Sequence, residues 1–225
     1  RKIKRLVGIA LTLCMILSTV PCTSLAVETP EERNDLKGFC GAEGGNLAWE
    51  IDPEEGTLTI SGNGKMADFE ANEKEEISTA PWFAYAKDPP NRKDRDLEKI
   101  IVEEGVTSVS NYAFAYCDDV KEIVLADTVT QIGNSAFAST DLQDTMYIPP
   151  NVVSIGDAAF ADCNYLDEVF FYGDAPAFVG ADLFKGNYVE ICCVAGTKGW
   201  MDSAAFNEQN RRWNGYKLIV SGSCG

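Results

Sequence analysis

A repeat of 23 residues constrains this chain more than any other feature of its sequence. Three segments, residues 100–114, 123–137 and 146–160, align without a gap. Six apolar columns keep the same phase in all three: Ile100/Ile123/Met146, Val102/Leu125/Ile148, Val106/Val129/Val152, Val109/Ile132/Ile155, Ala113/Ala136/Ala159 and Phe114/Phe137/Phe160. Val169 and Phe171 continue the first two columns into a fourth, degenerate repeat. A fixed period of this kind is typical of a solenoid, in which each repeat contacts only its neighbours.

Each repeat begins with apolar residues at every second position, as in Ile100 and Val102, and this pattern predicts a β-strand. A turn follows, and then a segment such as residues 111–114, for which we expect a short helical turn. One repeat cannot bury its apolar columns alone, so each column must stack on itself in the next coil. The expected fold is a β-rich solenoid of about 23 residues per coil, with one parallel sheet and short helical turns.

The repeats resemble the BspA-type leucine-rich repeats of bacterial surface proteins. That family follows an apolar strand with V-T-S-I-G-x-x-A-F-x-x-C, which residues 106–117 and 152–163 match closely. Thr140 stands where the middle repeat would have Cys, and Ser110 stands where the first would have Gly. The resemblance implies a leucine-rich-repeat fold in a secreted or cell-surface bacterial protein. Adhesion to host proteins or other cells is the associated role.

The flanking segments resemble the same proteins, so the resemblance covers residues 38–220. Residues 40–49, 56–62 and 80–82 are similar to the small β module that precedes such repeats. Residues 195–200 and 213–216 are similar to the closing segment. The last residues, 221–225, resemble residues 38–41, which suggests that a further module of the same polypeptide follows.

The first residues have the pattern of a signal peptide. Four basic residues within the first five precede an apolar run over residues 6–20, Pro21 ends the run, and Ser24-Leu25-Ala26 supplies a small-residue cleavage site. The run is short for a membrane span, which needs about 20 residues, so we expect no span after cleavage. A lipoprotein acylated at Cys22 is the alternative, and Pro21 fits it poorly.

These patterns divide the chain into five expected parts. They are a signal peptide (1–26), a linker (27–37), an N-terminal β capping module with a long loop (38–95), the repeat solenoid (96–198) and a C-terminal cap (199–225).

The segments around the repeats carry their own local patterns. Apolar alternation over residues 47–51 and 58–60, around a five-residue loop with Gly, predicts a hairpin that caps the open end of the solenoid. Trp82, Phe83 and Tyr85 lie in a charged, Pro-containing loop, where local core is a better interpretation than a ligand cage. We expect a short helix within residues 200–213 and a last strand over residues 216–220.

Eight cysteines occur in the chain, six of them after the signal peptide. Cys117 and Cys163 occupy the same position two coils apart, about 10 Å at the usual strand spacing, which exceeds the roughly 7 Å limit for a disulfide. We therefore interpret both as buried core residues. Cys192 and Cys193 should face opposite sides of a strand, whereas Cys40 and Cys224 lie near opposite ends and have no evident partner.

Composition argues against most catalytic and nucleic-acid-binding classes. The formal net charge is −16, which disfavours binding to nucleic-acid phosphates and to anionic membranes. The chain has no histidine, which removes His-dependent nucleophilic catalysis and His-ligated zinc. The acidic pattern at residues 94–98 hints at a calcium-binding loop, but it lacks the Gly and the terminal Glu that such a loop requires. Two carboxylates could hydrolyse a glycoside, but among 35 acidic residues some pair will always be close, so this is weak evidence for a glycosidase. We expect no enzyme, no metal and no cofactor.

The outward positions of the repeat strands are the candidate binding surface. In each strand the residue between two core positions points away from the core, which selects Ile101, Val124, Tyr147 and Phe170. The next outward column is Glu103, Ala126, Pro149 and Tyr172. Both columns are apolar for an exposed sheet, and they become aromatic toward the C-terminus, as contact surfaces often are.

The candidate ligand-binding residues are therefore Ile101, Glu103, Val124, Tyr147, Phe170 and Tyr172, and the expected partner is an extracellular protein or a glycan. Two alternatives remain open. The face is covered by flanking segments or a neighbouring module, or the chain is a structural spacer that displays other domains.

Overall fold

The computed structural model describes residues 36–86 and 97–221, which fall within one compact unit, Asn34–Gly225. The signal peptide, most of the linker, the first part of the candidate calcium loop, and Cys224 lie outside the described residues. The strands are β1 Lys37–Gly41, β2 Gly44–Asp52, β3 Thr57–Gly62, β4 Gly64–Lys65, β5 Ala71–Asn72, β6 Ile77–Ser78, β7 Lys99–Val102, β8 Val106–Val109, β9 Glu122–Leu125, β10 Gln131–Ile132, β11 Asp144–Ile148, β12 Ser154–Ile155, β13 Leu166–Phe171, β14 Phe178–Val179, β15 Glu190–Val194, β16 Phe206–Asn207, β17 Arg212–Trp213 and β18 Tyr216–Ser221, and the one helix described is α1, Phe83–Ala86.

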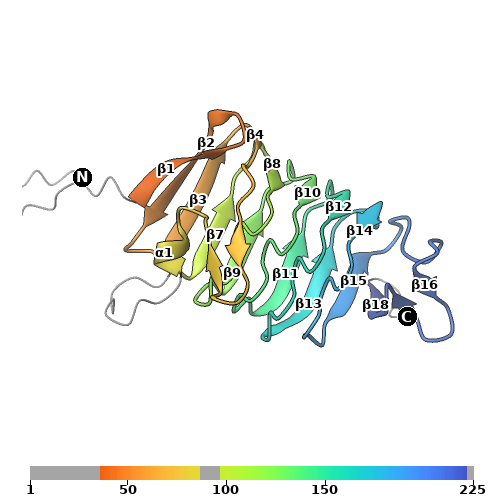
Figure 1. The fold of residues 1–225 in the computed structure, drawn as a ribbon. Coiled ribbons are helices and arrows are strands. Elements are labelled where there is room, and N and C mark those ends of the chain that lie inside the picture. The colour runs from red at the N-terminus through yellow and green to blue at the C-terminus, as the bar shows by residue number, and fades with distance from the viewer. Residues whose placement is uncertain (1–35, 87–96, 222–225) are drawn as a thin grey trace, which may run out of the picture. The chain divides into compact units, whose positions relative to one another are not determined.

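The strands stack side by side as a solenoid, and the period of 23 residues is confirmed in their register (Figure 1). β9 pairs parallel with β7, so that Ile123 lies beside Ile100. β13 pairs in the same way with β11, and Val169 lies beside Met146. Each apolar column therefore packs on its own copy in the next coil, as expected for a repeat that cannot bury its core alone.

The expectation of one parallel sheet is incomplete, because each coil contributes two extended segments. The second segments form their own parallel sheet, in the order β14-β12-β10-β8-β4, with Ile132 beside Val109. The first segments fall into two sheets, β1-β2-β3-β7-β9 and β11-β13-β15-β18-β17-β16. Both segments of a coil are extended because their main-chain groups find partners in the neighbouring coils rather than within their own.

The short helical turns expected after the second segment are not helical. Tyr112 and Tyr116 have φ values of 53° and 62°, in the left-handed region that interrupts an α-helix. Their N–H groups donate to Asn134 O at 2.9 Å and Ala138 O at 2.8 Å, both in the next coil. Left-handed residues recur at Ser135 and Ala158. These turns therefore join coils to each other, as the strands do.

Aromatic rings form the centre of the core. The fully buried Phe column stacks with ring centroids 5.7 Å apart between Phe114 and Phe137 and 5.0 Å apart between Phe137 and Phe160. Trp82 continues the column at 5.4 Å from Phe114, and its indole N–H donates to Ala113 O at 2.8 Å. The interpretation of Trp82 as local core is confirmed, since its side chain is fully buried.

A ladder of amide and carboxylate side chains joins successive coils at the surface. Asn111 Oδ1 accepts the N–H of Asn134 at 2.7 Å, Asn134 Oδ1 accepts that of Asp157 at 2.8 Å, and Asp157 Oδ1 accepts that of Ala181 at 2.7 Å. Asn111, Asn134 and Asp157 occupy equivalent positions in the aligned repeats, although only these hydrogen bonds show that they link the coils. Each side chain supplies the acceptor that a turn N–H lacks.

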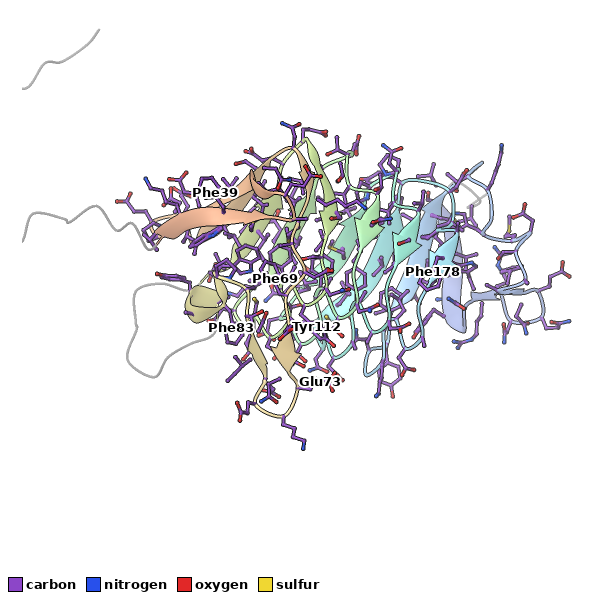
Figure 2. The ribbon with its side chains drawn as sticks, turned by 45° about the horizontal axis from the view of Figure 1, so that its top comes forward. Phe39, Phe69, Glu73, Phe83, Tyr112 and Phe178 are labelled. Atoms are coloured by element: carbon purple, nitrogen blue, oxygen red, sulfur yellow. The ribbon has the colours of Figure 1, made fainter. Side chains whose placement is uncertain are left out.

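At the N-terminal end, the predicted hairpin is present as β2 and β3. Asp52 Oδ1 accepts the N–H groups of Glu54 and Glu55, which closes its loop. β3 pairs parallel with β7, so the hairpin covers the edge that the first repeat would otherwise expose. A second small hairpin, β5–β6, projects from the sheets with Glu73 at its tip (Figure 2).

At the C-terminal end, the helix predicted within residues 200–213 is wrong. These residues form turns and the strands β16 and β17, which continue antiparallel from β18. Trp200 and Trp213 pack on each other at 4.9 Å and close the core beside Phe171. The segment is extended here because β17 pairs with β18 and so extends the sheet. The predicted last strand is confirmed as β18, parallel to β15.

The five described cysteines are buried and no disulfide joins them. Cys117 and Cys163 lie in the core as predicted, with Thr140 on the coil between them and its Oγ1 3.4 Å from Cys163 Sγ. Cys193 belongs to the core, whereas Cys192 lies in register with Phe170 on the other face of its strand. The prediction of opposite faces is confirmed.

Burial raises the pKa of the Cys40 thiol to about 12. The unfolded chain loses this proton near pH 8.5, well before the folded chain does. The free energy of unfolding should therefore be unaffected by this thiol below pH 8.5 and fall as the pH rises from there toward 12. Urea unfolding at pH 8 and pH 10.5 measures the fall, and Cys40→Ala should show a smaller one. Equal falls in both proteins would contradict a buried, neutral thiol.

Candidate functional site

The predicted outward residues lie on one face of the repeat strands, in two groups. Ile101 and Val124 are in register on β7 and β9, and Tyr147 and Phe170 are in register on β11 and β13. Ile101 is half-buried, and Val124 is 42% exposed. The two groups belong to different sheets, because no ladder joins β9 to β11 in the described part of the chain.

The three aromatic residues form a compact cluster, which we call the aromatic cluster (Tyr147, Phe170 and Tyr172). Ring centroids are 6.2 Å apart for Tyr147 and Phe170, 6.0 Å for Tyr147 and Tyr172, and 5.1 Å for Phe170 and Tyr172. Tyr147 is 52% exposed and Tyr172 is 50% exposed, whereas Phe170 is half-buried between them. The described flanking segments therefore leave the two tyrosine rings accessible to solvent.

The residues of the second outward column differ in whether their main-chain N–H bonds to the preceding coil. The N–H groups of Glu103, Ala126 and Tyr172 each donate to the preceding coil, to Ile60 O, Val102 O and Ile148 O at 2.9–3.1 Å. The equivalent residue of the third coil is Pro149, which has no N–H. The hydrogen bond that would reach Leu125 O is therefore missing at the point where the row of strands divides.

A cavity of about 510 Å³ opens between β9 and β11, and we call it the β9–β11 cleft. Its walls combine main chain, apolar side chains and polar side chains. Its lining includes Lys121, Glu122, Val124, Gln143, Asp144 and Tyr147. Tyr147 thus belongs both to the aromatic cluster and to the cleft, which makes them one continuous surface. Sequence analysis did not identify the cleft, although Pro149 in the outward column was the available indication.

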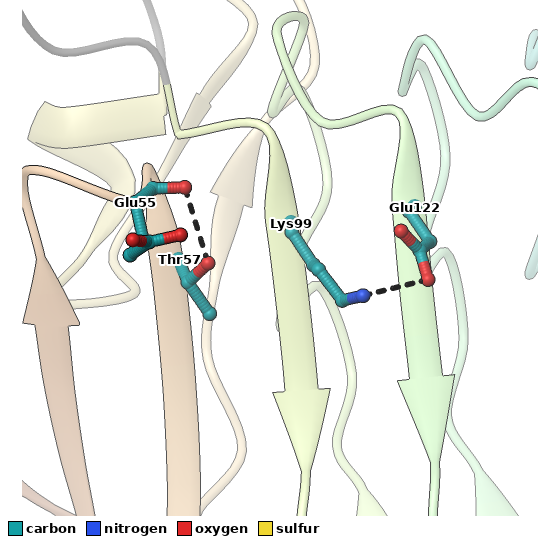
Figure 3. Close-up of polar contacts among 4 residues, drawn as sticks. All are labelled: Glu55, Thr57, Lys99 and Glu122. Carbon is teal, nitrogen blue, oxygen red and sulfur yellow. Dashed lines mark hydrogen bonds and ion pairs between the residues drawn. The ribbon is translucent and has the colours of Figure 1, made fainter.

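Ion pairs between coils flank this surface. Lys99 Nζ lies 2.8 Å from Glu122 Oε1 (Figure 3). Lys121 Nζ lies 2.6 Å from Glu98 Oε1. Each pair joins residues 23 positions apart, and Lys217 pairs with Glu190 near the C-terminal end. Exposed pairs of this kind contribute about 0–1 kcal/mol each. They reinforce the register without forming a catalytic or metal-binding arrangement.

The described residues contain no group of acidic and cysteine side chains arranged to hold a metal ion. In residues 36–86 and 97–221, no helix is long and apolar enough to cross a membrane. The polar groups of the cleft and the neighbouring aromatic rings are suited to holding a ligand by hydrogen bonds and ring contacts.

Together these features define a leucine-rich-repeat solenoid, a fold that typically serves binding rather than catalysis. Residues 92–210 match the BspA type Leucine rich repeat region in six copies, and the chain belongs to this family of bacterial surface proteins. No curated protein matches the chain in sequence.

Two solved structures of bacterial proteins are similar to the chain. A leucine-rich repeat protein from Eubacterium ventriosum ATCC 27560 is 27% identical with a TM-score of 0.54, over 79% of this chain and 42% of that one. The pneumococcal vaccine antigen PcpA is 16% identical with a TM-score of 0.42, over 86% of this chain and 44% of that one. This chain thus spans less than half the length of either protein.

Proposed function

We propose that the protein is a secreted or cell-surface binding module that recognises a host protein, another cell or a glycan, and that it has no catalytic activity. The observation that carries the proposal is the exposed aromatic cluster on the outer face of β11 and β13. Half-exposed aromatic rings gathered on a rigid sheet are typical of contact surfaces. Ile101, Glu103 and Val124 extend the proposed binding face along the preceding coils.

Membership of a family of bacterial surface proteins supports the proposed location and role. The signal peptide expected at the N-terminus supports secretion. A rigid solenoid also suits the role, because its side chains are held in place before the ligand arrives and little ordering is needed on binding.

The test is binding of the purified chain to an array of host matrix proteins and of bacterial and host glycans, beside the variant Tyr147→Ser/Phe170→Ser/Tyr172→Ser. We expect a ligand whose affinity falls about tenfold or more in this variant, because central aromatic contacts dominate binding energy. The matched control replaces Tyr165, Phe178 and Tyr188, which are at least as exposed but lie elsewhere on the surface, and it should bind normally.

The outcomes separate the candidate roles. A ligand lost only in the aromatic-cluster variant supports recognition through this face. Equal binding by both variants would contradict the proposed face. No ligand anywhere on the array would favour a spacer that displays other domains.

A further inference from the structure

We propose that a groove on the second parallel sheet, the one formed by β4, β8, β10, β12 and β14, binds a neutral oligosaccharide. The groove is a cavity of about 400 Å³ that reaches from β4 to β14, and we call it the second-sheet groove. Its lining includes Lys65, Asp68, Asn111, Gln131, Asn134 and Phe178. It shares no residue with the aromatic cluster, so this second site goes beyond the proposed binding face and does not depend on it.

The shape of the groove follows from the repeat. One side is a row of outward residues that lie in register on four neighbouring strands, Ser108, Gln131, Ser154 and Phe178. Further along two of these coils stand Gly133 and Gly156, which the close packing of the coils requires to be glycine. The side chains of Asn111 and Asn134 follow on the other side. A hollow remains where the glycines contribute no side chain.

The asparagines of the groove carry hydrogen-bond donors that the fold does not use. Asn111 Oδ1 and Asn134 Oδ1 each accept a main-chain N–H of the next coil, which fixes the orientation of both amides. Their NH₂ groups are left over, and neither has a partner within the described residues. Asp157 makes the equivalent contact with a carboxylate, so the contact between coils does not itself require an amide. The two amides therefore add free N–H donors to the groove.

The other polar groups of the groove suit a ligand made of hydroxyl groups. The exposed amide of Gln131 offers both donors and an acceptor. Ser110 also lines the groove, is only 5% exposed, and has an Oγ without a partner among the described residues. A sugar hydroxyl both donates and accepts, so it can bond to amides and hydroxyls alike.

The charges of the groove favour a neutral ligand. Lys65 and Asp68 are the two charged residues in its lining, and their charges are opposite. The chain as a whole has a net charge of −16, so this balance is local. Because neither sign dominates, the groove offers little electrostatic attraction to an anionic or a cationic ligand.

The strands beneath the groove leave no edge for an extended peptide. β8 pairs with β4 and β10, and β12 pairs with β10 and β14, so each inner strand has a neighbour on both sides. A peptide that recognises a sheet usually adds to an open strand edge, where main-chain groups are free. Recognition here must therefore use side chains, as it would for a sugar.

Phe178 gives the groove an apolar surface at one end. Its side chain is 59% exposed on β14, and its residue lies in register with Ser154 of β12 (Figure 2). An exposed ring beside amides and hydroxyls can contact the C–H groups of a sugar ring while the polar groups bond to its hydroxyls. The volume of about 400 Å³ falls within the usual range for ligand sites, roughly 300–1,000 Å³.

The test measures binding of the purified chain to neutral linear tetrasaccharides of glucose, galactose, mannose and N-acetylglucosamine by isothermal titration calorimetry. An acidic tetragalacturonate and an uncharged Gly-Ser peptide serve as comparison ligands. The main variant is Asn134→Asp, which keeps the acceptor for the Asp157 N–H and removes the free donor. Its matched control is Asn210→Asp, the same change at an exposed position outside the groove. Gln131→Ala beside Gln209→Ala, both at exposed positions, is a second pair.

We expect at least one neutral tetrasaccharide to bind, with affinity reduced about threefold to tenfold by Asn134→Asp and by Gln131→Ala. The two control variants should bind like the unmodified chain. Circular dichroism checks each fold, and Gln131→Ala decides the matter if Asn134→Asp does not fold. The inference would be overturned if no neutral tetrasaccharide binds, if the acidic sugar or the peptide binds as tightly, or if both groove variants bind normally.

Aromatic substitutions separate this site from the proposed binding face. Phe178→Ala should weaken the oligosaccharide about tenfold. The variant Tyr147→Ser/Phe170→Ser/Tyr172→Ser should bind it normally. A sugar lost only in the aromatic-cluster variant would overturn the second-sheet groove and support the proposed face instead.

Discussion

Phe137→Ala is expected to lower the free energy of unfolding by about 3–5 kcal/mol. The side chain is fully buried, and its ring lies between those of Phe114 and Phe160, 5.7 Å and 5.0 Å away. Removing it leaves a cavity in the middle of the Phe column. Because each repeat is stabilised mainly by its neighbours, the coils on both sides lose part of their support.

Urea unfolding followed by circular dichroism measures this loss. Phe39→Ala is the matched control, because Phe39 is 71% exposed on β1 and should change the free energy by less than about 0.5 kcal/mol. Similar losses in the two variants would mean that the Phe column does not form the core.

Gly156→Ala is expected to cost about 1–3 kcal/mol, by crowding rather than by leaving a cavity. A methyl group at this position would lie 2.5 Å from the N atom of Asn134 and 2.7 Å from the C atom of Gly133, both main-chain atoms of the preceding coil. Neither atom can move without disturbing the strand pairing. The coils would have to separate locally to admit one carbon atom.

The melting temperature of Gly156→Ala, compared with that of Gly45→Ala, tests this contact. At Gly45 a methyl group would meet only the Phe39 ring, at 3.8 Å, so that substitution should be well tolerated. A Gly156→Ala protein that melts like the unmodified chain would show that the coils are packed less closely than the structure indicates.

Most of the solenoid could be predicted because the sequence pattern and the packing of the coils share one period of 23 residues. Once Ile100 and Ile123 occupy equivalent positions, the parallel register between their strands follows. The same reasoning predicts the buried Phe column and the burial of Cys117 and Cys163. The outward positions of Tyr147 and Phe170 follow from strand alternation alone.

The features that could not be predicted depend on contacts that the repeat pattern does not contain. The segment 200–213 closes the core with Trp200 and Trp213, so tertiary packing determines its structure and the expected helix does not form. The left-handed turns at Tyr112 and its equivalents depend on hydrogen bonds to the next coil, which no single repeat reveals. The β9–β11 cleft lies where the row of first strands divides, beside Pro149, and its position requires the register of the whole row.

The central claim is that the aromatic cluster is a contact surface and not part of the core. The thermal unfolding of Tyr147→Ser/Phe170→Ser/Tyr172→Ser tests this claim most directly. Tyr147 and Tyr172 are about half exposed, so we expect the melting temperature to fall by only a few degrees, within about 5 °C. The circular dichroism spectrum should be unchanged. A collapse of the melting temperature, or loss of the folded spectrum, would show that these rings stabilise the core, and it would contradict the proposed binding face.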